Sequence, residues 1–217
     1  MALMSDSVTL RPLRRDDYDA LTELVRRMWY ADPEIGVDCA RRLATADFHH
    51  CLSCSTLATV AVRDGEVIGM ILARVERRAP RWRSTPLNPH VRRVLREGFS
   101  LIVSREGRRG IREAFGMVRT DAKLLHGLKS RYDAEIVLFL VDERMRGGGV
   151  GRTLFDHALS RFRTAGVRRY FLFTDTTCDV GFYDHRGLTR MRERYVPHRD
   201  GGSDTFYLYE GVCAGVA

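Results

Sequence analysis

The chain has 217 residues, 44% of them hydrophobic, which is typical of one globular domain with a sizeable core. No apolar run is long enough for a membrane span, the short polar N-terminus is unlike a signal peptide, and five cysteines without signs of secretion favour free thiols in a reducing compartment. The formal net charge is +8, but the sequence contains no recognisable nucleic-acid module and few interleaved aromatics, so we expect no nucleic-acid partner.

We therefore expect a single cytoplasmic domain over residues 1–217 without membrane contact, and its first elements are a strand and a helix. Residues 8–11 can form the strand, and Asp16 or Asp17 can cap the helix that follows. The apolar face of that helix would carry Tyr18, Leu21, Leu24, Val25, Met28 and Trp29.

A hairpin is predicted next. Residues 57–62 and 66–73 are apolar runs on either side of Asp64 and Gly65. An Asp-Gly pair between two such runs favours a type I′ turn, because both turn residues then need a positive φ.

Residues 78–133 form a stretch of loop and helix between the hairpin and the next strand. Its first part carries the loop-forming residues Pro80, Pro86 and Pro89. Apolar residues at near-helical spacing then predict helices over 90–103 and 111–128. Gly107 and Gly110 lie between the two patterns, so we expect them to break the helices.

The most informative stretch of the chain follows. Residues 136–141 are six consecutive apolar residues, which predicts a strand buried on both faces. After a short polar loop come Gly147, Gly148, Gly149 and Gly151, and then an amphipathic segment. Its apolar stripe consists of Val150, Leu154, Phe155, Ala158, Leu159 and Phe162.

This amphipathic segment predicts a helix that begins near Gly149 and ends near Gly166. The N–H groups of the first turn have no partner within a helix, and the helix dipole adds partial positive charge there. Such a helix start suits a pyrophosphate. Arg146 and Arg152 flank it and can add charge-assisted hydrogen bonds.

The glycine spacing separates three phosphate-binding motifs. A dinucleotide fingerprint would need Gly at position 152, and a nucleotide phosphate loop would need a Lys and one more residue between its glycines. Arg146-x-x-Gly149-x-Gly151 instead matches Q/R-x-x-G-x-G/A, the acyl-CoA pyrophosphate motif of the GNAT superfamily of N-acetyltransferases, which the chain resembles here.

The resemblance implies an α/β fold with a mixed, mainly antiparallel central sheet flanked by helices, splayed in the middle to admit acetyl-CoA as co-substrate. It covers residues 8–29, 56–76 and 134–209, so 78–133 becomes a helical insertion between the third and fourth strands. The implied cofactor-binding residues are Leu140 and Val141 through their main chain, and Arg146, Gly147, Gly148, Gly149, Val150, Gly151, Arg152 and Phe182.

A second part of the family pattern lies downstream. Residues 167–174 predict a strand, and Phe182-Tyr183-x-x-x-Gly187-Leu188 resembles the end of a short helix in the family. The chain departs from the pattern at two positions that often face the cofactor, where it has Thr176 and Asp179. Segments 189–196 and 205–209 are the expected last strands, with 198–203 as their turn.

Acetyl transfer to a primary amine requires a neutral nitrogen, and an alkylammonium has a pKa near 10.4, so a base must remove a proton. Glu135 lies eleven residues before Arg146, the offset of the general-base Glu in the similar protein-lysine branch of the family. Asp142, Glu143 and a chain of water molecules are alternatives. Tyr183 occupies the family position of a proton donor to the leaving sulfur.

Other patterns remain open. His49, His50, Cys51 and Cys54, with Cys39 nearby, have metal-like spacing but only one C-x-x-C, so we expect no metal. Cys178 could act as a thiol nucleophile or as a small apolar filler. The insertion has two interpretations, a wall of the acceptor site, or a dimer surface or extra core.

The acceptor is the least determined part of the function. A small amine that carries a carboxylate or phosphate, or a peptide N-terminus, is compatible with a chain of charge +8, whereas a strongly cationic polyamine would need a locally acidic pocket. A non-catalytic CoA-binding regulator and an acyltransferase for longer acyl groups are the alternative functions, and a homodimer is common among similar proteins.

Overall fold

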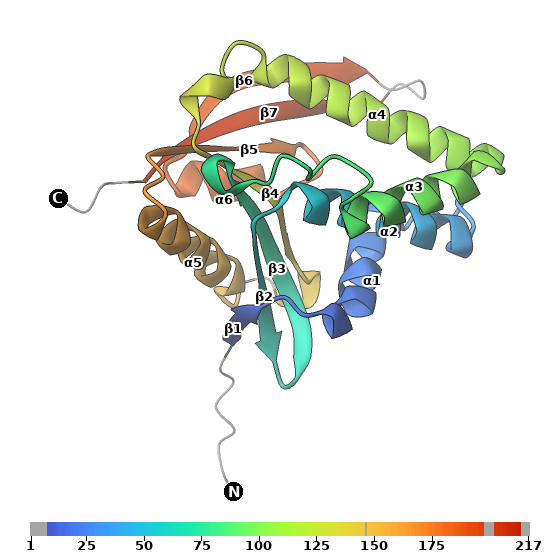
Figure 1. Cartoon of the computed structure of the whole chain (residues 1–217), viewed down its shortest axis with the longest axis horizontal. Coiled ribbons are helices and arrows are strands. Elements are labelled where there is room, and N and C mark those ends of the chain that lie inside the picture. Colours follow the sequence, from blue (N-terminus) through green and yellow to red (C-terminus); the bar gives the residue numbers. More distant parts are fainter. Residues whose placement is uncertain (1–7, 146, 198–201, 214–217) are drawn as a thin grey trace, which may run out of the picture.

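The computed structural model describes residues 8–145, 147–197 and 202–213 (Figure 1). In these residues a seven-stranded sheet has the order β1-β2-β3-β4-β5-β7-β6, and β4–β5 is its parallel pair among antiparallel neighbours. The strands are β1 Thr9–Pro12, β2 Leu57–Arg63, β3 Glu66–Val75, β4 Ala134–Val141, β5 Arg169–Asp175, β6 Thr189–Pro197 and β7 Ser203–Val212.

Helices cover both faces of this sheet. They are α1 Tyr18–Trp29, α2 Val37–Cys54, α3 Pro89–Ile102, α4 Arg105–Leu125, α5 Val150–Thr164 and α6 Val180–His185. Short 3-10 turns are η1 Arg15–Asp17, η2 Glu76–Arg78, η3 Lys129–Arg131 and η4 Glu143–Met145. Among the helices of the described residues, none combines the length and apolar character needed to cross a membrane. The mixed, mainly antiparallel α/β architecture confirms the expected fold.

The predicted hairpin is confirmed in detail. Asp64 and Gly65 connect β2 to β3 with φ values of 52° and 82°. Positive φ at both positions is the type I′ geometry, whose twist matches that of the paired strands.

Two separate cores lie on the two faces of β2–β4. Figure 1 shows α1 and α2 on one side of these strands and α5 on the other. On one face α1 and α2 bury Leu21, Val25 and Phe48. On the other face α5 buries most of its predicted apolar stripe, with Leu159 partly covered. This helix ends as predicted, because Gly166 has a φ of 70° and Val167 N donates to Phe162 O at 3.0 Å in a Schellman arrangement.

The prediction that β4 is buried on both faces was wrong. Val137, Leu138, Phe139 and Val141 are only partly buried. The reason is that β5 leaves β4 early: the parallel pairing covers residues 134–136 and stops there. The register with β3 also shifts at this point, so that Val137 is an extra residue, and both Val137 and Leu138 contact the α1/α2 core. A bulge bends the strand that carries it, and here the sheet splays beyond Ile136.

The prediction that Gly107 and Gly110 break two helices was also wrong. Both lie inside α4, which begins after Ser104, whose Oγ accepts a hydrogen bond from Gly107 N at 2.9 Å. A Cβ on Gly107 would overlap the carbonyl of Leu101, and one on Gly110 would lie 2.6 Å from Leu43 Cδ2. These glycines therefore allow close packing of the insertion and do not interrupt it.

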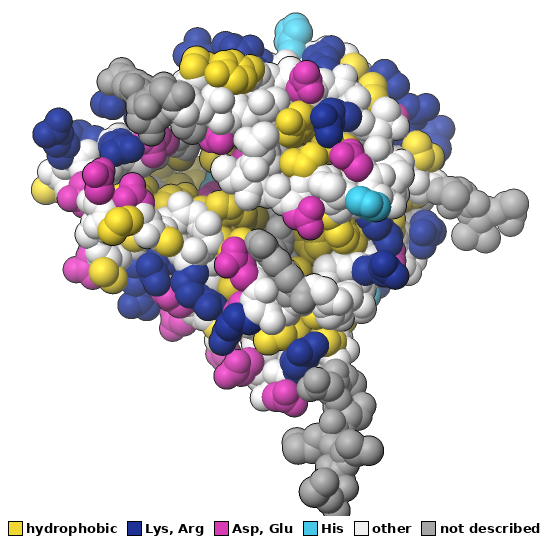
Figure 2. Space-filling model, turned by 180° about the vertical axis from the view of Figure 1, so that it is seen from behind, with side chains coloured by type: hydrophobic (Ala, Val, Ile, Leu, Met, Phe, Trp, Pro, Cys, Tyr) yellow, Lys and Arg dark blue, Asp and Glu magenta, His cyan; other side chains and the backbone are white. Residues whose placement is uncertain are grey.

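The insertion extends from α2 to β6, the edge strand of the sheet. Helix α3 packs beside α2, and α4 runs over β7 and β6 (Figure 1). Leu124 of α4 is buried with Tyr132, Phe171 and Leu208, and Arg192 Nη1 donates to the carbonyl of Leu124 at 2.9 Å. The C-terminal half of α4 therefore covers the strands on the far side of the splay. Figure 2 shows the molecule from behind, with Lys and Arg spread around a hollow in the surface.

Candidate active site

The start of α5 is the predicted phosphate site. Gly149 is its N-cap with a φ of 75°, and Thr153 N donates to Gly149 O at 3.0 Å. Within the described part of the chain no side chain caps this helix. The first-turn amides, from Val150 to Arg152, can therefore donate to an anion, and the helix dipole favours negative charge there.

Glycines are required at two points of this turn. Gly147 has a φ of 80° and Gly149 one of 75°, conformations that residues with a Cβ rarely adopt. Gly151 lies against the aromatic cluster, where an added Cβ would make ordinary contacts, 3.4 Å from Phe139 Cζ and 3.8 Å from Phe182 Cε2. Phe182 thus supports the helix start through ring contacts with Phe139, centroid to centroid 5.4 Å.

The cations around the turn differ in part from those predicted. Arg146 lies outside the described residues, and Arg152 is exposed beside the helix start. Arg63, which was not predicted, reaches the same loop from the end of β2: its Nη1 lies 3.3 Å from Met145 Sδ, and its Nη2 is close to Gly148. Its Nε is buried and has no partner among the described residues. No spacing in the sequence indicates this residue, because only the β2–β3 hairpin brings it there.

The splay leaves one edge of β4 open towards β5. Asp142 N donates to Ile68 O at 2.8 Å, so Asp142 and, two residues earlier on the same side of the strand, Leu140 direct their main chain to β3. Main-chain groups alternate along a strand, so those of Val141 point to the open edge. Of the two predicted main-chain contacts, Val141 is therefore the one on the side where an extended ligand could pair, and Leu140 is buried in the α1/α2 core.

Glu135 lies at the beginning of the splay, on the same face as its sheet neighbours Arg74 and Phe171. Its side chain is 13% exposed and is ion-paired with Arg74. Burial raises the pKa of Glu135, and the Arg74 guanidinium opposes that rise. The predicted base is thus buried and paired, and a carboxylate that becomes protonated more readily than usual is suited to proton transfer near neutral pH.

The two alternative carboxylates are less suited to this role. Asp142 is buried and accepts from Arg144 Nη2 at 2.7 Å and from Arg27 Nη2 at 3.2 Å. These hydrogen bonds, led by that from Arg144, hold its pKa well below the usual range. Glu143 is exposed in η4, on the loop that leads to the phosphate site.

Tyr183 is 8% exposed and lies between Phe182 and Tyr209. Burial raises its pKa, with a smaller contribution from Cys178, so the hydroxyl stays protonated and can donate a hydrogen bond. Burial likewise raises the pKa of the Cys178 thiol, followed by the charge of Asp175. A neutral thiol is a poor nucleophile, so the structure favours the packing interpretation of Cys178.

Thr176 and Asp179, the two departures from the family pattern, have local hydrogen bonds. Thr205 N donates to Thr176 Oγ1 at 3.2 Å, and Phe182 N donates to Asp179 Oδ1 at 3.2 Å. Asp179 is therefore the N-cap of α6, and it helps to place the Phe182-Tyr183 pair.

Asp121 of α4 is a site residue that the sequence analysis missed. Its Oδ1 is buried and has no hydrogen-bond partner within the described residues. Burial raises its pKa to about 7, and the charges of Glu135 and Asp175 add to the effect. Asp121 lies on α4 one turn before Leu124, which is buried with Phe171, the sheet neighbour of Glu135. The only signal in the sequence is a polar residue beside the apolar face of a helix.

The metal-like residues all lie on α2. His49 faces His90 of α3, with the two Nδ1 atoms 3.0 Å apart, while Cys51 is buried near Asp47. Burial, followed by the charge of His90, lowers the pKa of His49 to about 4. In residues 8–145, 147–197 and 202–213 no group of three or more His, Cys, Asp or Glu is arranged to hold a metal ion.

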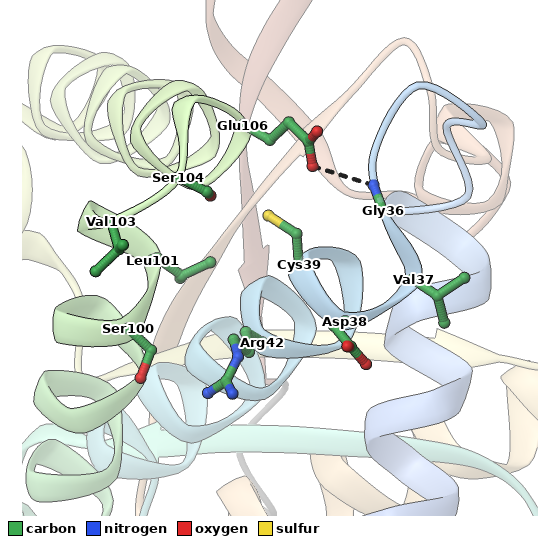
Figure 3. Close-up of a pocket in the computed structure, with 10 residues that line it drawn as sticks. All are labelled: Gly36, Val37, Asp38, Cys39, Arg42, Ser100, Leu101, Val103, Ser104 and Glu106. Carbon is green, nitrogen blue, oxygen red and sulfur yellow. Dashed lines mark hydrogen bonds between the residues drawn. The ribbon is translucent and has the colours of Figure 1, made fainter.

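A pocket of about 490 Å³ lies away from the splay, between the start of α2 and the α3–α4 corner (Figure 3). Cys39 and Arg42 line it from α2, and Glu106 Oε2 accepts from Gly36 N at 3.1 Å across its rim. It contains none of the predicted site residues.

Comparison with known proteins agrees with this geometry. Residues 18–188 match the model of the acetyltransferase (GNAT) family. A search of curated proteins finds no match. Among solved structures, the ribosomal-protein-S18-alanine N-acetyltransferase of Escherichia coli is 14% identical with a TM-score of 0.55, covering 97% of this chain and 96% of that one. Arylalkylamine N-acetyltransferase 2 of Aedes aegypti is 16% identical with a TM-score of 0.60, at 95% and 99% coverage.

At such identities the solved structures establish the fold, and the family match over most of the chain establishes its membership. Members of the family use acetyl-CoA as co-substrate. The glycine-led start of α5, the open edge of β4 and the matched residues together show that this chain belongs to the GNAT family of acetyltransferases.

Proposed function

We propose that the chain transfers an acetyl group from acetyl-CoA to a primary amine by direct attack in a ternary complex. The observation that carries this proposal is the uncapped, glycine-led start of α5 beside the open edge of β4. These two features suit the two parts of one molecule, since amides at a helix start bind a diphosphate and a free strand edge pairs with an extended amide-bearing arm.

Residues of the turn would hold the diphosphate. The amides of Gly149, Val150, Gly151 and Arg152 donate to it, and Gly147 and Gly148 let the backbone approach. Arg63 and Arg152 contribute positive charge, together with Arg146, whose position is not described. Val141 would hold the arm through its main chain, with Leu140 behind it and Phe182 supporting the helix start.

Glu135 would accept the proton that the attacking ammonium must lose, either directly or through a water molecule. Its pairing with Arg74 fixes the side chain, and its burial makes it a stronger base than an exposed Glu. Main-chain amides along the splayed part of β4 could stabilise the oxyanion. Tyr183 would donate a hydrogen bond to the departing sulfur, and the raised pKa keeps its proton in place until then.

The acceptor is expected to enter over the face of β4 that carries Glu135. A small-molecule amine or a peptide N-terminus fits this position. All five cysteines are free thiols, which is consistent with a cytoplasmic location.

The test combines a binding and a turnover measurement on the purified chain. Calorimetry with acetyl-CoA and CoA should show saturable binding, and an amine panel should release free thiol only when both substrates are present. Binding without thiol release would instead indicate a CoA-binding regulator. Stronger competition by succinyl- or longer acyl-CoA than by acetyl-CoA would indicate another acyl donor.

A further inference from the structure

The insertion carries most of the hydrophobic surface that the fold leaves uncovered. Nine of the thirteen large hydrophobic side chains that are exposed in the described residues lie between positions 82 and 118. Single exposed hydrophobic residues are ordinary on a protein surface, whereas a contiguous group marks an interaction site. Such a group lies on the second half of α3 and at its C-cap, and consists of Leu95, Phe99, Ile102 and Val103.

These four residues, which we call the α3 patch, occupy one side of the helix. Leu95, Phe99 and Ile102 follow one another at intervals of four and three residues, so their side chains share a face. Phe99 and Val103 are 81% and 84% exposed, which means that their side chains protrude. On the opposite face Leu101 is buried, and α3 packs there beside α2. The α3 patch is therefore an outer face that nothing in the described chain covers.

Arginine side chains border the α3 patch. Arg92 and Arg96 are exposed along one side of it, and Arg105 is exposed just beyond the corner between α3 and α4. Within the described residues none of these three forms an ion pair. Arg108 Nη1 donates to the carbonyl of Ile102 at 2.8 Å, which holds a fourth guanidinium at the end of the patch.

The nearby carboxylates leave this positive charge in place, because they face inwards. Glu97, the acidic residue of α3, is buried and is paired with Arg42 of α2 at 3.1 Å and with Arg93 at 2.9 Å. Glu106 accepts from Gly36 N at 3.1 Å and so points towards the start of α2 (Figure 3). The outer face of the insertion thus combines protruding apolar side chains with unpaired cations.

This combination decides which partner fits. A second copy related by a two-fold axis would bring the arginines around one α3 patch against those around the other, and like charges across an interface repel. A nucleic acid binds cations and aromatic rings, but of the four patch residues only Phe99 is aromatic. A partner helix would need a groove, whereas Phe99 and Val103 protrude.

We propose that the α3 patch binds the surface of an anionic lipid bilayer. Its apolar side chains would enter the boundary between headgroups and acyl chains, while the arginines would pair with the phosphate and carboxylate groups of the lipids. The expectation of no membrane contact rests on the absence of a long apolar run, which excludes a spanning segment and leaves attachment to the surface open.

The position of the patch leaves the candidate active site accessible. Figure 1 shows α3 and the corner where it meets α4 on the far side of the molecule from α5 and its glycine-led start. The inference therefore does not depend on the proposed acetyl transfer, and lipid binding can be measured with neither substrate present.

The experiment measures sedimentation of the full chain with lipid vesicles. Vesicles of phosphatidylcholine are compared with vesicles in which part of this lipid is replaced by phosphatidylserine. We expect the chain to bind the anionic vesicles at least about ten-fold more strongly than the neutral ones, and to lose affinity as the salt concentration rises. Absent binding to the anionic vesicles, or equal binding to both kinds, would overturn the proposal.

The apolar part of the patch is tested with Phe99→Ala. This variant should weaken vesicle binding about ten-fold, because one aromatic side chain no longer enters the bilayer. Its urea unfolding should match that of the wild type, since the replaced side chain is exposed. Tyr195→Ala, an exposed aromatic position on β6, is the matched control and should leave binding within about two-fold. Unchanged binding in Phe99→Ala would reject the α3 patch as the binding surface.

The charged part is tested with the double variant Arg92→Gln, Arg96→Gln. We expect vesicle binding to weaken about 30-fold, the usual contribution of two cations at an anionic surface. The double variant Arg161→Gln, Arg163→Gln removes the same charge from exposed positions on α5 and should change binding within about two-fold. An equal loss in the two double variants would show general attraction of a chain of charge +8 and reject the proposal.

Two further measurements separate insertion into lipid from other outcomes. Phe99→Trp should be quenched by brominated acyl chains in anionic vesicles more strongly than the wild type, whose tryptophans are Trp29 and Trp82. Equal quenching would contradict insertion of the patch. Sedimentation velocity without lipid should give the same molecular mass for the wild type and Phe99→Ala. A dimer that Phe99→Ala dissociates would assign the patch to a second copy of the chain and overturn the proposal.

Discussion

Arg74 and Glu135 are cross-strand neighbours in β3 and β4, and the Arg74 guanidinium donates to the Glu135 carboxylate at the point where the sheet begins to splay. Arg74 also holds Glu76, so one cation orients two carboxylates. This pairing places a buried acid beside the open edge of β4 with a fixed geometry. It also distinguishes Glu135 from Asp121, which lies on the same face with a buried oxygen that has no partner within the described residues.

Glu135→Gln keeps the size of the side chain and a hydrogen bond to Arg74 but removes the base. We expect kcat to fall by roughly 10²-fold or more, in line with the usual contribution of a positioned base, while acetyl-CoA affinity stays unchanged. Because the pKa of Glu135 is raised, wild-type kcat/KM should decline as the pH falls through that pKa, and the variant should lose this limb. Glu76→Gln, which removes the other partner of Arg74, is the control. A full rate in Glu135→Gln would favour a water chain.

Tyr183→Phe removes one hydroxyl from a buried aromatic cluster. We expect turnover to fall by roughly ten-fold or more, since a proton donor aids a modestly basic leaving thiolate. Calorimetric affinity for acetyl-CoA should stay within about two-fold of the wild type, given that the ring contacts with Phe182 and Tyr209 are retained. Unchanged turnover would reduce Tyr183 to a packing role.

Gly149→Ala tests the start of α5. A Cβ at a φ of 75° costs about 1–2 kcal/mol, so the turn should relax and its amides lose their alignment. We expect weaker acetyl-CoA binding together with a lower unfolding temperature. Gly116→Ala in α4, where an added Cβ meets nothing within 4 Å, should stabilise the chain by up to about 1 kcal/mol and leave binding alone. Normal affinity in Gly149→Ala would contradict the proposed diphosphate site.

Asp121→Asn should change stability in a pH-dependent way. The folded pKa of about 7 lies above the ordinary Asp value, so folding favours the neutral carboxyl and stability is lost as the pH rises from about 4 through 7. At pH 8 the free energy of unfolding of the variant should therefore exceed that of the wild type by on the order of 2 kcal/mol, and at pH 4 the two should be nearly equal. Denaturant unfolding at both pH values measures the difference. A variant no more stable than the wild type at pH 8 would show that the buried Asp121 carboxylate does not lower the free energy of unfolding.

Gly107→Ala tests the packing of the insertion. The added methyl would overlap the carbonyl of Leu101, so α3 and α4 would have to separate, at a cost of about 1–3 kcal/mol. Gly98→Ala in α3, with open space around it, is the control and should be neutral or stabilising. Urea unfolding of both variants measures the difference. Equal stability of the two variants would contradict the close contact between Gly107 and Leu101.

Local patterns were enough to predict much of this fold. The Asp64-Gly65 turn, the apolar stripe of α5 and the Gly166 terminus each depend on residues close together in the chain. Backbone conformation and helix periodicity are set by such neighbours, so the sequence could reveal them. The phosphate motif belongs to the same class, because its glycines and its helix are contiguous.

The parts decided by tertiary structure depend on distant residues. The bulge at Val137 and the early departure of β5 made β4 half-buried, although its composition resembles that of a fully buried strand. Gly107 fits inside α4 because Leu101 lies against it, and Arg63 reaches the phosphate turn across a hairpin.

Asp121 shows the limit most clearly. Its spacing in the sequence marks only a polar position on a helix, yet three-dimensional packing buries its Oδ1, and the charges of Glu135 and Asp175 add to the rise in its pKa. Burial and the approach of like charges are properties of a folded chain, because they arise only when segments far apart exclude water together. The sequence therefore determined the elements and the phosphate motif, and the tertiary structure decided the charge and shape of the acceptor side.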